Sequence, residues 1–180
     1  MTTPPFAPVT PADIRVVSSQ LGREARGVVG IAARCVCGNP TVVSTTPRLA
    51  DGTPFPTFYY LTHPAATAEM SRLEAAQVMV GMNERLQADA ELREAYRRAH
   101  EAYLADRAQF GDVPEIDGVS AGGMPTRVKC LHAVLGHALA AGPGVNPFGD
   151  EALALSAWSP ERCECDEPGA ARTDGSEDDA

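Results

Sequence analysis

Cysteine and histidine residues that can ligate a metal ion recur along the sequence. Cys35 and Cys37 lie in a turn-forming run, where the following Gly38 lets the backbone fold so that both sulfurs point to one side. The single residue between the two cysteines is a shorter spacing than in the usual zinc half-site. Soft thiolates combined with an imidazole are the ligands that Zn²⁺ selects. We therefore predict a zinc site whose ligands are Cys35, Cys37, His63 and Cys130.

The fourth predicted ligand, Cys130, belongs to a run that is predicted to be helical. At about 100° per residue, Cys130 and His137 fall on one line of this helix, at the margin of its apolar stripe, whereas His132 projects to the opposite, polar side. Cys130 and His137 are two turns, roughly 10 Å, apart, which is too far for both to ligate one ion. Cys130 is therefore the predicted ligand, and His137 is expected to support it or to act as a separate catalytic group.

Arg127 and His137 are the candidates for catalysis in an alternative in which the protein is an enzyme. Only three of the predicted ligands then hold the ion, the ion keeps a water molecule, and His132 or His137 acts with Arg127 on a phosphate-bearing substrate. The helix start at 122–126 would also suit a phosphate or carboxylate, together with Arg127 and Lys129. It lacks the spacing of a Walker loop, so an ordinary Gly-Pro helix start is the favoured interpretation.

Each candidate also has a simpler interpretation. A buried cysteine is often just a small hydrophobic residue, and a histidine at a helix margin is most often a hydrogen-bonded core residue. Taken singly, Cys130 and His137 fit these roles better, whereas the four ligands together favour a metal. The remaining pair, Cys163 and Cys165, lies in an acidic tail whose flexibility makes a site costly to order, so the prediction excludes it.

The composition limits the partners and the location of the protein. The chain has 180 residues, 44% of them hydrophobic, which suits one globular domain at 1–158 followed by an acidic disordered tail at 159–180. Of the net charge of -9, residues 161–180 carry -6, so the rest is nearly balanced and offers no basic stripe for nucleic acid. There is no signal sequence and no long apolar run, so we expect no membrane span and a cytoplasmic location. Five cysteines in that compartment are reduced or bind metal.

The elements that must position these residues follow from periodicity and turn signals. Thr10 and Gly22 bound a short helix, and β-branched or aromatic runs predict three strands, at 27–33, 41–45 and 57–61. We expect an antiparallel meander, in which the end of the third strand lies beside the start of the second. This arrangement would bring His63 towards the cysteine turn.

Helices make up the rest of the predicted domain. Two are expected between residues 64 and 111, with Asp89 as the cap of the second. A further helix is expected from 124 to 141, and Asp150 is expected to cap a last short one. The fold class is therefore α+β, with a small three-stranded antiparallel meander packed against four to five helices.

Several short motifs resemble a known but uncharacterised family. They are Cys35-Val36-Cys37-Gly38-Asn39-Pro40, Asp51-Gly52-Thr53-Pro54-Phe55-Pro56-Thr57, Leu73-Glu74-Ala75 and the run 122–132. Over residues 19–155 the chain is similar to the actinobacterial domain of unknown function 501. The resemblance implies no activity, but genes of this family tend to lie beside those for a septum-formation initiator and an exopolyphosphatase-like protein, which associates it with cell division or envelope processes. The family usually has cysteine at the position of His63, an exchange that fits a tetrahedral zinc ligand.

Three functions remain open at this point. The leading one is a closed, structural zinc site with four protein ligands that supports the binding of a protein partner. The second is the metal-dependent hydrolase with His137 and Arg127. The third is an iron–sulfur protein, against which a histidine ligand argues.

Overall fold

A three-stranded antiparallel sheet separates the helices in the computed structural model, which describes residues 7–172. Its strands follow one another in chain order as β1 (Val28–Arg34), β2 (Pro40–Thr45) and β3 (Tyr59–Leu61), so the predicted meander is confirmed. Every residue of β2 is buried, because this strand has a neighbour on each edge and side chains packed on each face.

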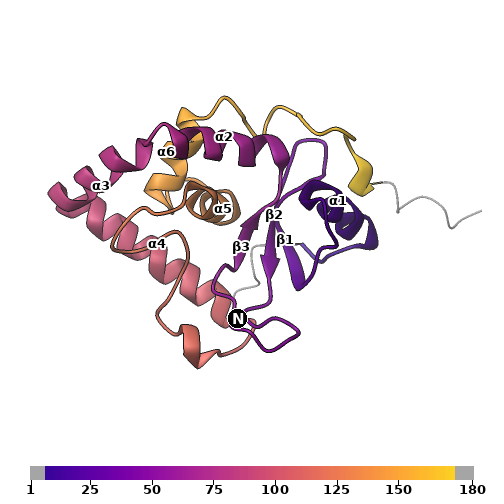
Figure 1. Ribbon diagram of the computed structural model, residues 1–180, viewed down its shortest axis with the longest axis horizontal. Coiled ribbons are helices and arrows are strands. Elements are labelled where there is room, and N and C mark those ends of the chain that lie inside the picture. Colours follow the sequence, from indigo (N-terminus) through magenta and orange to yellow (C-terminus); the bar gives the residue numbers. More distant parts are fainter. Residues whose placement is uncertain (1–6, 173–180) are drawn as a thin grey trace, which may run out of the picture.

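The two faces of the sheet bury different side chains, as alternation along a strand requires. Val42 and Tyr59 join the larger core. Val43, the neighbour of Val42, joins a small core with Val17 of α1 (Pro11–Leu21). Helix α1 therefore covers one face of the sheet and the other helices gather on the opposite face (Figure 1).

Helix α1 begins and ends where its sequence predicts. The side-chain oxygen of Thr10 accepts the N–H of Asp13 at 3.1 Å, the carboxylate of Asp13 accepts the N–H of Thr10 at 3.0 Å, and Gly22 closes the helix. Buried Asp13 also accepts a hydrogen bond of 2.6 Å from Arg34, which donates to the carbonyl of Gly38 at 2.9 Å. These bonds tie α1 to the turn that carries the first two cysteines.

The chain between β3 and residue 111 forms three helices, where two were predicted. They are α2 (Pro64–Ala75), α3 (Val78–Ala88) and α4 (Ala90–Ala108). The first two are separated at Gln77, whose left-handed φ of 59° interrupts the helical path. Asp89 caps α4, as predicted, because its carboxylate accepts two N–H groups of the first turn.

Helix α5 (Leu131–Ala141) begins later than predicted, because the residues before it form a loop. The side-chain amide of Asn83 pairs with Val128, accepting its N–H and donating to its carbonyl, at 2.9 Å each. The N–H of Lys129 donates to a carbonyl across the loop at 2.7 Å. These bonds use the backbone groups that a helix would need. Cys130 is consequently the residue before the first turn and does not lie within a helix.

Helix α6 (Pro147–Leu155) packs closely against α5. Its cap is Asn146, whose side chain accepts the N–H of Gly149 at 3.1 Å, so the predicted cap, Asp150, is wrong. Asp150 instead accepts the N–H of Gly144 at 2.8 Å. The described residues contain six α-helices, more than the four to five predicted because of the break before α3, and the α+β class is confirmed.

Residues 159–172, which we name the C-terminal strap, lead back from α6 to the β1–β2 turn and to α1 (Figure 1). The N–H of Val36, in the turn, donates to the carbonyl of Pro160 at 3.1 Å. The short 3-10 helix Ala170–Arg172 at the end of the strap contacts α1. Residues 173–180, the rest of the predicted tail, lie outside the described part of the chain.

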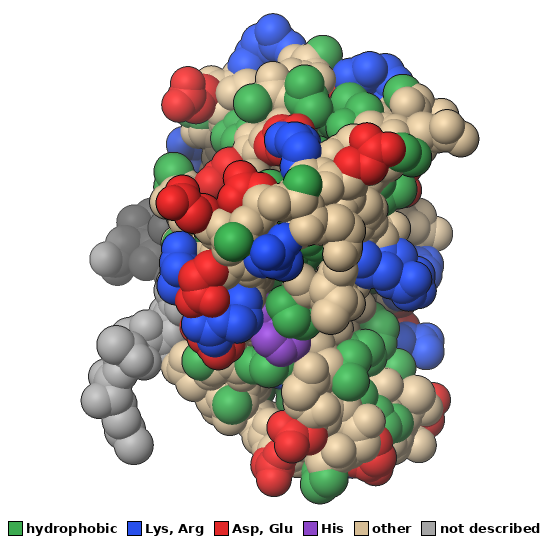
Figure 2. Space-filling view, turned by 90° about the vertical axis from the view of Figure 1, so that its left-hand side faces the viewer, with side chains coloured by type: hydrophobic (Ala, Val, Ile, Leu, Met, Phe, Trp, Pro, Cys, Tyr) green, Lys and Arg blue, Asp and Glu red, His purple; other side chains and the backbone are tan. Residues whose placement is uncertain are grey.

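Acidic and basic side chains are mixed over the helical face that Figure 2 draws, with no continuous basic area. Ion pairs on the surface of the molecule include Arg97 with Glu94 and Arg85 with Glu151. Across residues 7–172, every helix is either too short or too polar to pass through a bilayer.

Candidate metal centre

Two pairs of cysteines meet where the C-terminal strap crosses the β1–β2 turn. Cys35 and Cys37 come from the turn, and Cys163 and Cys165 come from the strap. The four sulfur atoms lie within 4.8 Å of one another, and those of Cys37 and Cys165 are 3.6 Å apart. In a site of four thiolates, Zn–S bonds of about 2.3 Å put neighbouring sulfurs about 3.8 Å apart. The cluster therefore has the dimensions of a tetrahedral thiolate site.

The turn holds Cys35 and Cys37 through its own backbone. The N–H of Cys35 donates to the carbonyl of Asn39, and the N–H of Gly38 donates to the carbonyl of Cys35, both at 2.8 Å. The N–H of Cys37 donates to the sulfur of Cys35, and the N–H groups of Asn39 and Gly169 donate to the sulfur of Cys37. Such donors stabilise a thiolate, which is the form of cysteine that binds a metal.

The thiols differ in how readily they ionise. Burial opposes ionisation of Cys37, but the N–H groups of Asn39 and Gly169 and the thiols of the strap outweigh it, so its pKa falls to about 7. Burial raises the pKa of Cys35, and burial together with the contact to Cys37 raises the pKa of Cys165. One thiolate therefore forms readily near neutral pH, and a bound cation would favour ionisation of the others.

Asn39 fastens the strap beside the cysteines. Its side chain is buried, its Nδ2 donates to the carbonyl of Glu167 at 2.8 Å, and its Oδ1 accepts the N–H of Ala171 at 3.0 Å. One amide thus satisfies two backbone groups of the strap, as an adjacent β-strand would. The residue that follows the cysteine turn therefore positions the segment that brings the second cysteine pair.

His63 lies against this cluster and contacts one of its sulfurs. It is fully buried at the N-cap of α2, where its Nδ1 accepts the N–H of Ala66 at 3.5 Å. The proton of the neutral ring is therefore on Nε2, which lies 3.3 Å from the sulfur of Cys165. Burial lowers the pKa of His63 against the opposing charges of Glu164 and Asp166, which favours the neutral ring. In this geometry His63 donates a hydrogen bond to the sulfur of Cys165.

Cys130 belongs to a second group of ligand atoms, with Glu74 and His132. Because α5 begins only at Leu131, His132 stands beside Cys130, and its predicted projection to the opposite side is wrong. Its Nδ1 lies 3.8 Å from the sulfur of Cys130 and 3.1 Å from Oε1 of Glu74. The hydrogen bond to Cys130 and the carboxylate of Glu74 outweigh the effect of burial and raise the pKa of His132 to about 9.

The helix start at 122–126, which the sequence suggested could bind an anion, is not a helix start in the structure. The N-terminus of α5 lies further along the chain, and a glutamate of the protein already binds there. The run 122–129 is a loop, and the first turn of α5 begins at Leu131. The N–H of Leu131 donates to Oε1 of Glu74 at 2.7 Å, so a carboxylate of the protein itself sits at this helix terminus.

His137 and Arg127, the candidates for catalysis, occupy different environments. His137 is fully buried, stacked on Tyr59 with ring centroids 5.7 Å apart and edge-on to Tyr103. Burial lowers its pKa to about 4, so its ring is neutral near pH 7. Arg127 is exposed in the loop before α5. His137 is thus a core imidazole, whereas Arg127 is a surface guanidinium.

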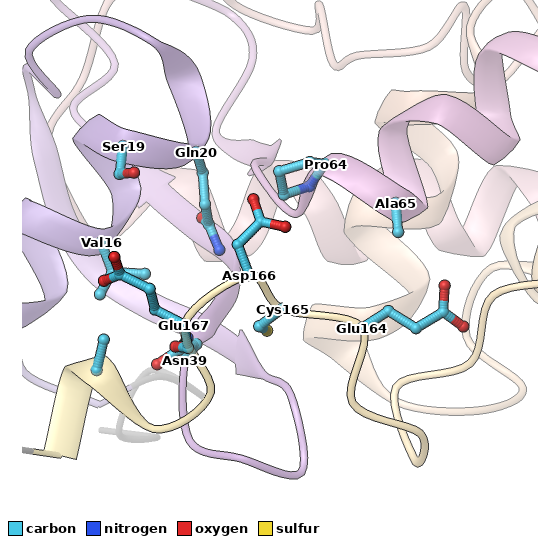
Figure 3. Close-up of a pocket in the computed structure, with 11 residues that line it drawn as sticks. Val16, Ser19, Gln20, Asn39, Pro64, Ala65, Glu164, Cys165, Asp166 and Glu167 are labelled. Atoms are coloured by element: carbon cyan, nitrogen blue, oxygen red, sulfur yellow. The ribbon is translucent and has the colours of Figure 1, made fainter.

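A cavity of about 360 Å³ lies beside the cysteine cluster, between α1, the start of α2 and the strap. Figure 3 shows Asp166 of the strap beside Gln20 of α1, and Glu167 extending towards Val16 of the same helix. Cys165 is also among the residues that line the cavity. The described residues that line it include these two acids and Glu164 but no lysine or arginine. Because one wall consists of strap residues, the shape of the cavity depends on the position of the strap.

The structure brings together only part of the predicted ligand set. The two turn cysteines meet, His63 lies against them, and Cys130 belongs to the other group. Cys163 and Cys165, which the prediction excluded, complete the cluster of four sulfurs. A signal for them is present in the sequence, since the strap repeats the Cys-x-Cys spacing of the turn. The prediction discounted this repeated spacing, because the acidic composition around the two cysteines is typical of a disordered tail.

Among known protein families, one family model matches most of the chain. The model carries the description "Protein of unknown function (DUF501)" and matches residues 31–154. No curated protein and no solved structure matches the chain. The matched segment contains the turn cysteines, His63 and Cys130, whereas the strap lies beyond its end.

Proposed function

Since the chain belongs to the DUF501 family, whose description assigns no activity, we propose from the chain's own geometry that it is a zinc-stabilised binding protein. One Zn²⁺ ion is held by Cys35, Cys37, Cys163 and Cys165. The observation that carries this proposal is the convergence of four sulfurs, from two segments far apart in the sequence, within 4.8 Å of one another. Four protein ligands leave no position for water, which is the pattern of a structural zinc site.

A single ion suits this cluster better than an iron–sulfur cluster. A cluster with several irons distributes its thiolates over different iron atoms, whereas these sulfurs are close enough to share one ion. Four thiolates in tetrahedral positions suit Zn²⁺ and also a single iron. Colour separates the two, because the zinc protein is colourless and an iron–thiolate protein absorbs visible light.

The proposed role of the ion is to hold the strap against the sheet. The strap contributes half of the ligands and one wall of the neighbouring acidic cavity. Glu164 pairs with Arg162, so among the described residues that line the cavity Asp166 and Glu167 are the carboxylates that we propose contact a ligand. A cavity with this charge and without basic lining suits the cationic side chain of a protein partner. The resemblance noted from the sequence associates such a partner with cell division or envelope processes.

Elemental analysis of purified variants tests the metal centre. We expect Cys37→Ser and Cys163→Ser each to contain one equivalent of zinc less than the wild type. Val36→Ser is the matched control, because Val36 lies between the turn cysteines but is 61% exposed. It should retain the full zinc content. A Cys163→Ser protein with the zinc content of the wild type would show that the strap cysteines are not ligands.

Titration of the cavity with Nα-acetyl-arginine amide, followed by NMR, tests the binding role. We expect the amide signals of Gln20, Ala65 and Glu167 to shift in the zinc-loaded protein and to stop shifting after the zinc is chelated. Nα-acetyl-glutamine amide, a neutral compound that keeps the same backbone groups, should leave them unchanged. Equal shifts with both compounds, or shifts that persist without zinc, would contradict a zinc-dependent cationic site.

A further inference from the structure

Glu74, Cys130 and His132 converge from two helices at the N-terminal end of α5. Glu74 lies in the last turn of α2, Cys130 is the N-cap of α5, and His132 lies in its first turn. One ligand atom from each lies within 4.8 Å of the other two. None of the three residues belongs to the cluster of four cysteines, so this group is a separate place in the fold.

The distances in this group match the edges of a coordination tetrahedron. Nδ1 of His132 lies 3.8 Å from the sulfur of Cys130 and 3.1 Å from Oε1 of Glu74. Around Zn²⁺, with bonds of about 2.3 Å to sulfur and about 2.0 Å to nitrogen and oxygen, the corresponding edges are about 3.5 Å and 3.3 Å. Only small shifts would bring all three atoms into contact with one ion.

Hydrogen bonds behind two of these residues orient them towards the space between the three. Nε2 of His132 lies 3.2 Å from the carbonyl oxygen of Thr67, which can only accept, so Nε2 carries a proton. Nδ1, which faces Cys130 and Glu74, is therefore the nitrogen that would bind a metal, and it would release its own proton on binding. Oε1 of Glu74 also accepts the N–H of Leu131 at 2.7 Å. A carbonyl behind the imidazole and an N–H beside the carboxylate are the partners that metal ligands have in proteins.

The charges and the exposure of the group also suit a cation. A cysteine thiolate and a glutamate together neutralise a divalent ion, and the histidine adds a neutral ligand. The side chains of Glu74 and His132 are each 27% exposed, so solvent reaches this place. We propose that Glu74, Cys130 and His132 form a second zinc centre, which keeps a coordination position open to water. Three protein ligands and a water molecule are the pattern of a reactive zinc ion, in contrast to the closed centre of four cysteines.

Zinc content and thiol reactivity test the second centre independently of the first. We expect Cys130→Ser and Glu74→Gln each to lower the zinc content by one equivalent, whether or not the cysteine cluster is intact. Glu74→Gln keeps the acceptor for the N–H of Leu131, so it tests the carboxylate without removing that bond. Ser71→Ala is the control, because Ser71 contacts the outer nitrogen of His132 and is no ligand. It should retain the zinc of the wild type.

Alkylation of Cys130 gives a second measurement that needs no variant. In the wild-type protein, saturating Zn²⁺ should slow the reaction of Cys130 with iodoacetamide at least tenfold, because the ion covers the sulfur. The same rate with and without Zn²⁺ would overturn the proposal, as would equal zinc contents in the wild type and a folded Cys130→Ser protein. In that case Cys130 and His132 are a simple thiol–imidazole pair.

Discussion

At the scale of single residues, hydrogen-bond partners distinguish the roles of His63, His132 and His137. In His63, Nδ1 accepts the N–H of Ala66, so the proton on Nε2 is directed to the sulfur of Cys165. In His132, Nε2 donates to the carbonyl of Thr67, and Nδ1 faces the thiol of Cys130 and the carboxylate of Glu74. His137 lies among aromatic rings and contacts only the amide of Asn146 at 3.2 Å among the hydrogen-bond partners described. The three imidazoles therefore lie in different environments, and we expect different effects when they are replaced.

Replacing His63 should weaken zinc binding at the cysteine cluster without abolishing it. A donor to a ligand sulfur typically contributes about 10- to 100-fold in metal affinity. We expect a decrease of this size for His63→Ala and a smaller one for His63→Gln, whose amide can still donate, measured by competition with a chromophoric chelator. Loss of a full zinc equivalent in both variants would instead make His63 a ligand, as the sequence predicted.

The buried ring of His137 should make the protein less stable as the pH falls. The pKa of His137 is about 4 in the folded protein, below its ordinary value of 6.5, because burial disfavours the charged ring. Between these values the unfolded chain binds a proton that the folded chain does not. The contribution of His137 is thus complete above pH 6.5 and declines as the pH falls to 4, by about 3 kcal/mol in total.

Urea unfolding at pH 7 and pH 5 measures this effect. Between the two pH values, the free energy of unfolding should fall by about 2 kcal/mol more in the wild type than in His137→Gln. The comparison with the variant cancels the contributions of the other titrating groups. An equal decrease in both proteins would show that His137 titrates normally in the folded state.

At the scale of elements, local signals predicted some boundaries and tertiary contacts set the others. The caps Thr10 and Asp89 begin α1 and α4 as predicted, because a cap acts on N–H groups within three residues. The start of α5 could not be predicted in this way, because the Asn83 side chain that holds the preceding loop lies 45 residues away in the sequence. The break between α2 and α3 could not be predicted either, because the residue at the break is Gln77 and not a glycine or proline.

The contact between α5 and α6 should depend on Gly149. A Cβ atom there would lie 2.3 Å from the carbonyl oxygen of Val134 and 2.5 Å from Cβ of Ala138, so the two helices would have to move apart. We expect Gly149→Ala to lower the free energy of unfolding by about 3 kcal/mol, measured in urea or guanidinium.

Gly81 in α3 provides the matched control for this substitution. A Cβ atom at Gly81 meets nothing within 4 Å, and the residue is exposed in a helix. Gly81→Ala should therefore raise the free energy of unfolding by roughly 0.5 to 1 kcal/mol through helix propensity. Similar effects of the two substitutions would show that α6 does not approach α5 as closely as described.

At the scale of the whole molecule, the C-terminal strap connects the end of the helical layer to the sheet turn and to α1. Three features hold the strap in this position: its two cysteines, its backbone hydrogen bonds with Asn39, and the contact of its 3-10 helix with α1. Removal of the ion should therefore release the strap first, while the core of the sheet and helices α2 to α6 remains folded. Chelation should change the molecule locally and not unfold it.

Trp158, the single tryptophan of the chain, reports on this release. It precedes the strap, is 2% exposed and packs against His63 with ring centroids 5.2 Å apart. Chelation of the zinc should shift its fluorescence emission to longer wavelengths, with little change in far-ultraviolet circular dichroism. Cys163→Ser should show the shifted emission before any chelator is added, and Cys130→Ser should respond like the wild type. Emission that is insensitive to chelation would mean that the strap is held without the ion.

The sequence by itself determined the class of the fold, the meander, the cysteine turn and the helix starts capped by Thr10 and Asp89. All of these depend on alternation, propensity and hydrogen bonds between residues close together in the chain. Only the tertiary structure decided which cysteines meet, because Cys37 and Cys165 are 128 residues apart and no local pattern records their proximity. It likewise separated Cys130 from the turn and placed it with Glu74, through a loop that a distant asparagine holds out of the helix. Ligand types are a local property of a sequence, whereas a coordination set depends on the path of the whole chain.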